Sequence, residues 1–265
     1  MSGDHVQAPD ALDGAVRAAL IPYLLAWADD ELVLGHRDSE WTGFAPQIEE
    51  DVAFSSIAQD EIGHAALIYG IVAALADDDP DRLALRRPAE EYRHAAVVER
   101  PNGDWAHTIV RHYLYDLADA LRADALSRSA YAPLAGAVRK MAREEHYHTM
   151  HDAAWWERLR DGTPESYARL GDACRTLAPL AVDLFGETPD EARLVAAGVV
   201  PVASAALLDA WRAEARPLVT ALDPALGRLL DGAPAPRAAR PIGADFGALH
   251  AEMTLVSASG LGERW

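Results

Sequence analysis

Apolar residues in this chain recur every three or four positions, a spacing that places them on one face of an α-helix. In residues 52–75 one such face carries Glu61 and His64 between Ile57 and Ile68, so two polar groups interrupt an apolar stripe. A second stripe repeats the Glu-x-x-His pattern, and its members are Leu134, Val138, Met141, Glu145, His148, Asp152 and Trp155. Because a buried carboxylate is costly when unpaired, these stripes predict either an ion-pair network or a bound cation.

The same periodicity predicts an all-α protein. Four long helices are expected at 11–37, 46–75, 105–126 and 134–160. Shorter helices are expected at 163–185, 189–197, 203–222 and 244–258, with connections at 76–88 and 231–243. Pro46 suits the first turn of the second helix, and Thr163 or Ser166 is expected to cap the fifth. We therefore expect one domain, 1–265, with a four-helix bundle over about 11–160 and accessory helices over 163–258.

The amino-acid composition limits the classes of partner that the protein is expected to bind. The chain has 265 residues, half of them hydrophobic, and a formal net charge of −18. So acidic a surface argues against nucleic acid or an anionic membrane as the main partner. Cys174 is the single cysteine, which excludes internal disulfides and thiolate metal clusters. The sequence contains no long uncharged apolar run and no apolar leader, so we expect a cytoplasmic protein.

Acid and histidine pairs at Glu-x-x-His spacing also arise by chance in an acidic chain. Two further pairs are Glu91/His94, in a charged segment, and Asp104/His107, at a predicted helix start. We interpret these two as structural, with Asp104 as a helix cap or a partner of the helix dipole. Glu61/His64 and Glu145/His148 differ from them because they lie in the middle of helices, on apolar stripes.

A dinuclear metal site in a helical bundle needs one more acid from each of the two remaining helices. Glu31 is the candidate in 11–37 because it lies on an apolar stripe, whereas Asp29 and Asp30 are expected to be solvated. In 105–126 both Asp119 and Asp116 could face inward, and we favour Asp119 as the ligand and Asp116 as a neighbouring group. The predicted metal ligands are therefore Glu31, Glu61, His64, Asp119 (alternatively Asp116), Glu145 and His148. A buried polar network without metal is the alternative.

Acids next to the ligands are expected to orient the histidines. Ligating imidazoles usually donate their other N–H to a carboxylate. If the second and fourth helices face each other, Asp60 can orient His148 and Glu144 can orient His64. Mixed carboxylate and imidazole ligation favours iron or manganese over structural zinc. A di-iron centre of this kind can reduce dioxygen.

Other polar and aromatic residues are given lesser roles by the sequence. His36, His112, His146 and His151 are interpreted as surface groups or neighbours of the ligands. The aromatic residues that could line or support a cavity are Trp27, Tyr113, Tyr147, Trp155 and Trp156. No other catalytic residue and no separate cofactor-binding motif is predicted. No Gly-rich phosphate loop is present, and Arg86/Arg87 and Arg237/Arg240 are expected to be solvated or to face a partner.

Four stretches carry a resemblance to a known family. QDEIGHA at 59–65, VERPNGDWAHTIVRHYLYD at 98–116, the segment 143–166 and the C-terminal AEMTLVSASGLGERW resemble phenylacetyl-CoA epoxidase subunits, most closely the PaaC type. The resemblance implies a ferritin-like fold and a multicomponent bacterial monooxygenase of phenylacetate catabolism. It also implies the partners: PaaA-type and small subunits, together with a flavin and iron–sulfur reductase that brings electrons from NADPH.

The resemblance leaves the role of this chain open. In the family a PaaA-type di-iron subunit epoxidises the ring of phenylacetyl-CoA, and many PaaC-type subunits resemble scaffolds that have lost the ligands. This sequence keeps a candidate at every ligand position. We therefore expect an oxygenase subunit with two iron ions of its own, acting on an aromatic acyl-CoA. The alternative is a non-catalytic structural subunit. A ferritin-like iron store is less favoured because the chain carries additional C-terminal helices.

Overall fold

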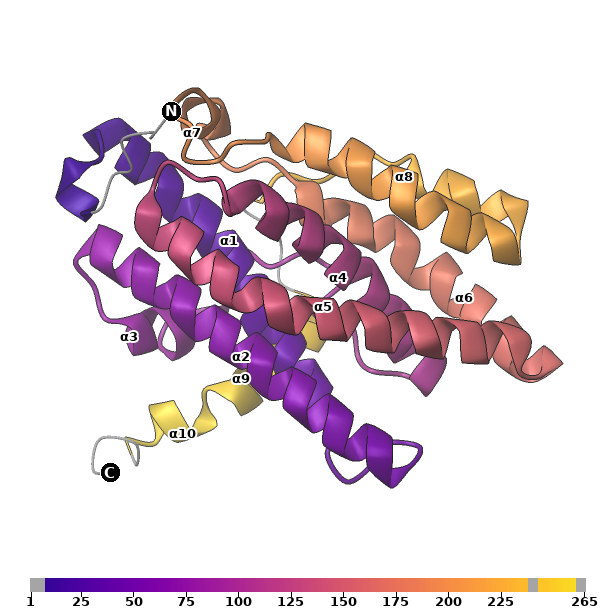
Figure 1. Ribbon diagram of the computed structural model, residues 1–265. Helices are drawn as coiled ribbons and strands as arrows, with labels where there is room; N and C mark the ends of the chain where they lie inside the picture. The colour runs from indigo at the N-terminus through magenta and orange to yellow at the C-terminus, as the bar shows by residue number, and fades with distance from the viewer. Residues whose placement is uncertain (1–7, 238–242, 261–265) are drawn as a thin grey trace.

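The computed structural model describes residues 8–237 and 243–260, and the regular structure in them is helical. The long helices are α1 (Gly14–Ser39), α2 (Ile48–Ala76), α4 (Trp105–Leu126) and α5 (Ala132–Asp161), which lie side by side as a bundle (Figure 1). They lie close to the predicted ranges, which confirms the all-α, ferritin-like prediction. Across the described ranges, no helix combines the length and the apolar character that crossing a membrane requires.

Short elements surround the bundle. Near the N-terminus and between α2 and α4 these are η1 (Pro9–Ala11), α3 (Pro80–Leu85) and η2 (Ala89–Glu91). After α5 they are α6 (Pro164–Ala181), η3 (Val182–Phe185), α7 (Glu191–Ala196), α8 (Ser204–Leu222), η4 (Pro224–Leu230), α9 (Ala244–Met253) and α10 (Leu255–Ala258). Helices α6 and α8 pack along α4, where the Trp211 indole N–H donates to the Leu114 carbonyl at 2.9 Å (Figure 1).

Several helix ends differ from the predictions for local reasons. Helix α2 begins at Ile48 after an extended Gln47, so Pro46 precedes the helix instead of lying in its first turn. The connection expected at 76–88 contains α3, which has Pro80 in its first turn and the Asp79 side chain as its cap. Thr163 caps α6 in a reciprocal capping box with Ser166, and the helix ends four residues before Phe185, in the 3-10 turn η3.

Helices α1 and α2 pack closely at Gly35. A Cβ atom there would lie 2.9 Å from Ile62 Cγ1 and 3.0 Å from Glu61 Cβ. Only a residue without a side chain permits this approach. Because Glu31 lies one turn before Gly35 on α1, the contact places the Glu31 carboxylate beside α2.

Two acids on α1 hold the accessory segments against the bundle. Asp29 pairs with Arg87 and accepts a 2.5 Å hydrogen bond from the Tyr69 hydroxyl. Asp30 pairs with Arg237 at 2.7 Å and accepts the backbone N–H of Ala95, also at 2.7 Å. Residues from α2, the α3–α4 connection and the segment before α9 are thereby bound to a single helix.

These contacts correct two expectations. Asp29 and Asp30 are fully buried, not solvated, because the α3–α4 connection and the segment containing Arg237 cover the side of α1 that the stripe analysis assigned to solvent. Arg87 and Arg237 are also buried, at 5% and 7% exposure, and pair with acids inside the protein. Arg86 is exposed as expected, whereas Arg240 lies outside the described residues.

The variant Asp30→Ala should lower the free energy of unfolding by about 3–5 kcal/mol, because it leaves the Arg237 guanidinium buried without a counter-charge. Chemical denaturation followed by circular dichroism measures this loss. The matched control is Asp124→Ala, since Asp124 is 72% exposed in its side chain and pairs with Arg128 at the surface. The control should change stability by less than about 1 kcal/mol. Equal effects of the two substitutions would show that the Asp30 pair does not stabilise the fold.

Candidate metal centre

Acidic and imidazole side chains from all four long helices converge in the middle of the bundle. Glu31 comes from α1, Glu61 and His64 from α2, Asp116 from α4, and Glu145 and His148 from α5. None of these residues is more than 2% exposed. On α1, α2 and α5 the apolar stripes explain this burial, because Trp27, Ile57 and Met141 pack into the core one turn before the ligand candidates.

The converging side chains form two overlapping groups, each with ligand atoms within 4.8 Å of one another. The first group is Glu31, Glu61, His64 and Glu145, and the second is Glu61, Asp116, Glu145 and His148. Glu61 and Glu145 belong to both. Each group therefore has one histidine and one acid of its own, and the two groups share a pair of carboxylates.

Each histidine directs one ring nitrogen toward the shared carboxylates. His64 Nδ1 lies 3.0 Å from Glu145 Oε1, and His148 Nδ1 lies 3.3 Å from Glu61 Oε1. Their Nε2 atoms point outward, His64 to Glu144 Oε2 at 2.9 Å and His148 to Asp60 Oδ2 at 3.4 Å. The crossed contacts expected from the sequence are thus present, with Asp60 and Glu144 at the edge of the bundle, 36% and 45% exposed in their side chains.

On α4 the structure brings Asp116, not Asp119, into the cluster. Asp119 lies one turn further along the helix and belongs to neither group. Its Oδ1 accepts hydrogen bonds from Trp27 Nε1 at 2.7 Å and from Arg122 at 3.0 Å. The preference for Asp119 as the ligand does not match this placement, and the alternative, Asp116, does.

A further buried network adjoins the cluster at Asp116. His112 Nδ1 lies 3.1 Å from both Asp116 Oδ1 and Asp152 Oδ2, and its Nε2 lies 3.2 Å from Asp38 Oδ2. Asp38 also pairs with Arg111 at 3.0 Å. The surrounding acids raise the pKa of His112 well above its usual value, against the opposing effect of burial. His112 therefore connects Asp116 to Asp152 and to the Asp38–Arg111 pair.

The sequence pattern gives no role to Asp38 or Arg111 and marks Asp152 only as a member of the apolar stripe. Asp38 falls in a predicted turn, so nothing in the sequence indicates that it is buried. The contact between His112 and Asp116 could be predicted from the sequence, because the two residues are four positions apart on one helix face and are therefore adjacent in space.

The cluster offers buried oxygen and nitrogen donors that could hold metal ions. The buried atoms without a hydrogen-bond partner include Glu31 Oε2, both oxygens of Glu61, Glu145 and Asp116, and Nδ1 of His64 and His148. Buried polar atoms are rarely left unpaired in a native protein. Burial, together with the nearby carboxylates of Glu31 and Glu145, raises the pKa of Glu61 well above its usual value. Positive charge is what this arrangement of oxygen and nitrogen donors lacks.

The remaining predicted residues lie elsewhere. Asp104 caps α4 by accepting the backbone N–H of His107 at 2.9 Å, as expected. Glu91 is exposed, and His94 pairs with Glu99 at 2.8 Å. Among the aromatic candidates, Trp27 contacts the cluster through a hydrogen bond to Glu31. The others are Tyr113 and Trp156, which are buried in the core, Trp155, which is partly buried, and Tyr147, which is 65% exposed.

A bundle of four long helices with two Glu-x-x-His motifs and two further acids facing its centre defines a ferritin-like protein. The family model of the phenylacetic acid catabolic proteins (PaaA_PaaC) matches residues 1–230, and the chain belongs to this family. A relative in Escherichia coli (strain K12) is the 1,2-phenylacetyl-CoA epoxidase component designated C. It is 34% identical over 196 residues, which cover 74% of this chain and 79% of the relative.

The component of the same epoxidase that is designated A is a more distant relative. It is 25% identical over 185 residues, which cover 70% of this chain and 60% of that component. The chain is thus similar to both types of protein that the family model joins, with the higher identity to the C component.

In metal-free protein, Glu61→Gln should raise the free energy of unfolding by about 1–3 kcal/mol at pH 7, because it removes a carboxylate that is buried among other carboxylates. The raised pKa of Glu61 fixes the sign of the pH dependence. The carboxylate destabilises the fold above its unfolded pKa, so the gain should shrink as the pH falls and Glu61 becomes protonated.

Thermal and urea unfolding in a chelating buffer at pH 7 and pH 5 measure this gain. The matched control is Glu157→Gln on α5, because Glu157 is exposed. A loss of stability in Glu61→Gln, or an equal gain in the control, would show that the Glu61 carboxylate does not destabilise the metal-free bundle.

Proposed function

We propose that this chain is a subunit of a multicomponent oxygenase that epoxidises the aromatic ring of phenylacetyl-CoA, and that it binds two iron ions of its own. The names of its relatives in Escherichia coli support the reaction and the substrate. The observation that carries the metal centre is the pair of four-residue groups that share Glu61 and Glu145.

Each residue has a definite task in this proposal. Glu31 and His64 would hold one iron ion, Asp116 and His148 would hold the other, and the shared Glu61 and Glu145 would lie between them. Bound iron would supply the electrons that reduce dioxygen. Glu144 and Asp60 orient the two imidazoles, and their acceptor oxygens keep the outward Nε2 atoms protonated.

The burial of the cluster also serves the reaction. The apolar residues around it exclude bulk water, which strengthens the electrostatic interactions inside and protects reactive species from side reactions. Electrons would come from a separate flavin and iron–sulfur reductase, and PaaA-type and small subunits would complete the complex in the cytoplasm. The two E. coli relatives are themselves named as subunits, which supports assembly with other chains.

One observation favours the alternative, a structural subunit without turnover of its own. Two cavities of about 460 and 300 Å³ border the outer side of α2. Their linings do not include the cluster residues. Leu67, Ile71 and Pro133 contribute to the first cavity, and Leu32, Ile62 and Ala84 contribute to the second. An aromatic ring would need access to the iron ions to be oxidised there, and no residue of the cluster lines either of these cavities. This separation suits a metal centre that stabilises the fold of a partner-binding subunit.

Reconstitution of the epoxidase with a variant of this chain separates the two functions. The double variant Glu61→Gln/Glu145→Gln removes both shared carboxylates, and its iron content should fall from two per chain to none. If this chain is catalytic, turnover of phenylacetyl-CoA by the assembled complex should fall at least about 100-fold.

Size-exclusion chromatography shows whether the variant still assembles with the other subunits, and Glu157→Gln serves as the control for a surface change. Full turnover by a complex that contains the iron-free variant would overturn the catalytic assignment. Wild-type protein that binds no iron would overturn the metal centre itself.

A further inference from the structure

One carboxylate of the cluster differs from the others in its hydrogen bonds. Glu31 Oε1 accepts the indole N–H of Trp27 at 2.7 Å and the hydroxyl of Tyr115 at 2.9 Å. Glu31 Oε2 accepts no hydrogen bond and lies 3.6 Å from His64 Nδ1. Glu61 and Glu145 keep both oxygens without a hydrogen-bond partner. Glu31 thus has a single oxygen available to a cation, whereas the shared carboxylates have two each.

Trp27 is held in turn by Asp119. The indole N–H lies 2.7 Å from Asp119 Oδ1 as well as 2.7 Å from Glu31 Oε1, so one donor lies between two carboxylates. Trp27 is 2% exposed, and both acids are fully buried. The single indole N–H is therefore shared between the two acids, and Asp119 holds the ring in place from the side opposite Glu31.

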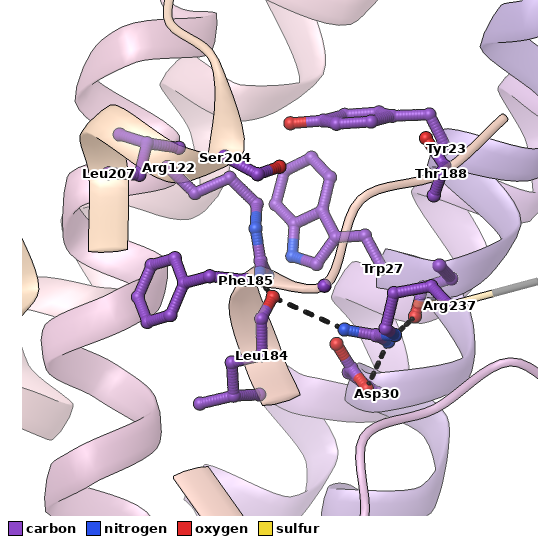
Figure 2. A pocket seen from close by; sticks show the side chains of 12 residues that line it. Tyr23, Trp27, Asp30, Arg122, Leu184, Phe185, Thr188, Ser204, Leu207 and Arg237 are labelled. Carbon is purple, nitrogen blue, oxygen red and sulfur yellow. Dashed lines mark hydrogen bonds and ion pairs between the residues drawn. The ribbon is translucent and has the colours of Figure 1, made fainter. Parts of the chain in front are cut away.

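Arg122 completes the support from behind the indole ring. Its guanidinium donates to Asp119 at 3.0 Å and lies 5.5 Å from the centre of the Trp27 ring, within the range of a cation–π contact. It also donates to the Leu184 carbonyl of η3 at 3.3 Å. Figure 2 shows Trp27 and Arg122 side by side at a cavity of about 20 Å³, which is room for about one water molecule.

We propose that Trp27 and Asp119 are positioning residues that restrict Glu31 to one donor oxygen and so make the two ions of the centre unequal. An ion held by Glu31 and His64 would meet a carboxylate with one oxygen already engaged. Asp116, in the other group, has no hydrogen-bond donor on either oxygen, although His112 Nδ1 lies 3.1 Å from its Oδ1. The inference rests on the metal centre of the proposed function, and it gives Asp119 a role that differs from that of a ligand.

Titration with Co(II) tests this inference without turnover, because the visible absorption of Co(II) responds to its ligands. In Trp27→Phe and in Tyr115→Phe the protein should still bind two Co(II) ions per chain. The affinity of one ion should fall about 10- to 100-fold and its absorption should change, whereas the other ion should be unaffected. Asp119→Asn should retain two ions and alter the same one.

Matched controls separate positioning from a general loss of structure. Trp41→Phe removes an indole that donates to Thr108 at 2.9 Å, and Tyr69→Phe removes a buried hydroxyl that donates to Asp29. Both donate to acceptors other than Glu31, so both controls should titrate like the wild type. Circular dichroism identifies variants that fail to fold, and Tyr115→Phe then replaces Trp27→Phe as the deciding variant.

The outcomes distinguish the inference from the proposed function. If wild-type protein binds no Co(II), the metal centre and the inference both fail. If it binds two ions while Trp27→Phe and Tyr115→Phe titrate like the controls, only the inference fails. Loss of one whole ion in Asp119→Asn would overturn the inference in another way, since it would make Asp119 a ligand.

Discussion

The burial of many carboxylates inside one helical bundle is the constraint on which the rest of this structure depends. A charged group in a protein interior needs an opposite charge nearby, because water no longer solvates it. At the periphery arginines meet this need: Arg87 pairs with Asp29, Arg237 with Asp30, Arg111 with Asp38 and Arg122 with Asp119.

At the centre of the bundle, the carboxylates of the described residues have no such arginine partners. Glu31, Glu61, Glu145 and Asp116 contact histidines and one another, and none of them has an arginine partner among the ion pairs of the described residues. The inner carboxylates are therefore the part of the bundle that is left for cations.

The accessory elements are part of this arrangement. Leu184 of η3 offers its carbonyl to both Arg122 and Arg237, so the segment after α6 supports two of the outer pairs. Through Arg122 this support reaches Asp119 and Trp27, and through Trp27 it reaches Glu31. A change far along the chain can therefore alter the position of one carboxylate in the centre of the bundle.

Helical periodicity predicts the bundle well because it is a local property, whereas the partners of buried acids are not. The helix expected at 105–126 has these bounds in the structure, and the inward direction of the two Glu-x-x-His motifs follows from their apolar neighbours. The burial of Asp30 cannot be predicted in this way, because an apolar stripe describes one face of a helix and gives no information about segments that cover another face. Periodicity also cannot separate Asp116 from Asp119, which lie one turn apart and both face inward. Arg122, three residues after Asp119, is the available signal, since residues at this spacing are neighbours on a helix.

The central claim is that the two groups sharing Glu61 and Glu145 each hold one metal ion. Crystals grown with Mn(II), with anomalous diffraction data collected to locate the manganese, test it most directly. We predict two anomalous peaks per chain, one beside His64 and Glu31 and the other beside His148 and Asp116, with Glu61 and Glu145 next to both. A bundle that contains no peak at this place, with its carboxylates paired to protein groups instead, would contradict the claim.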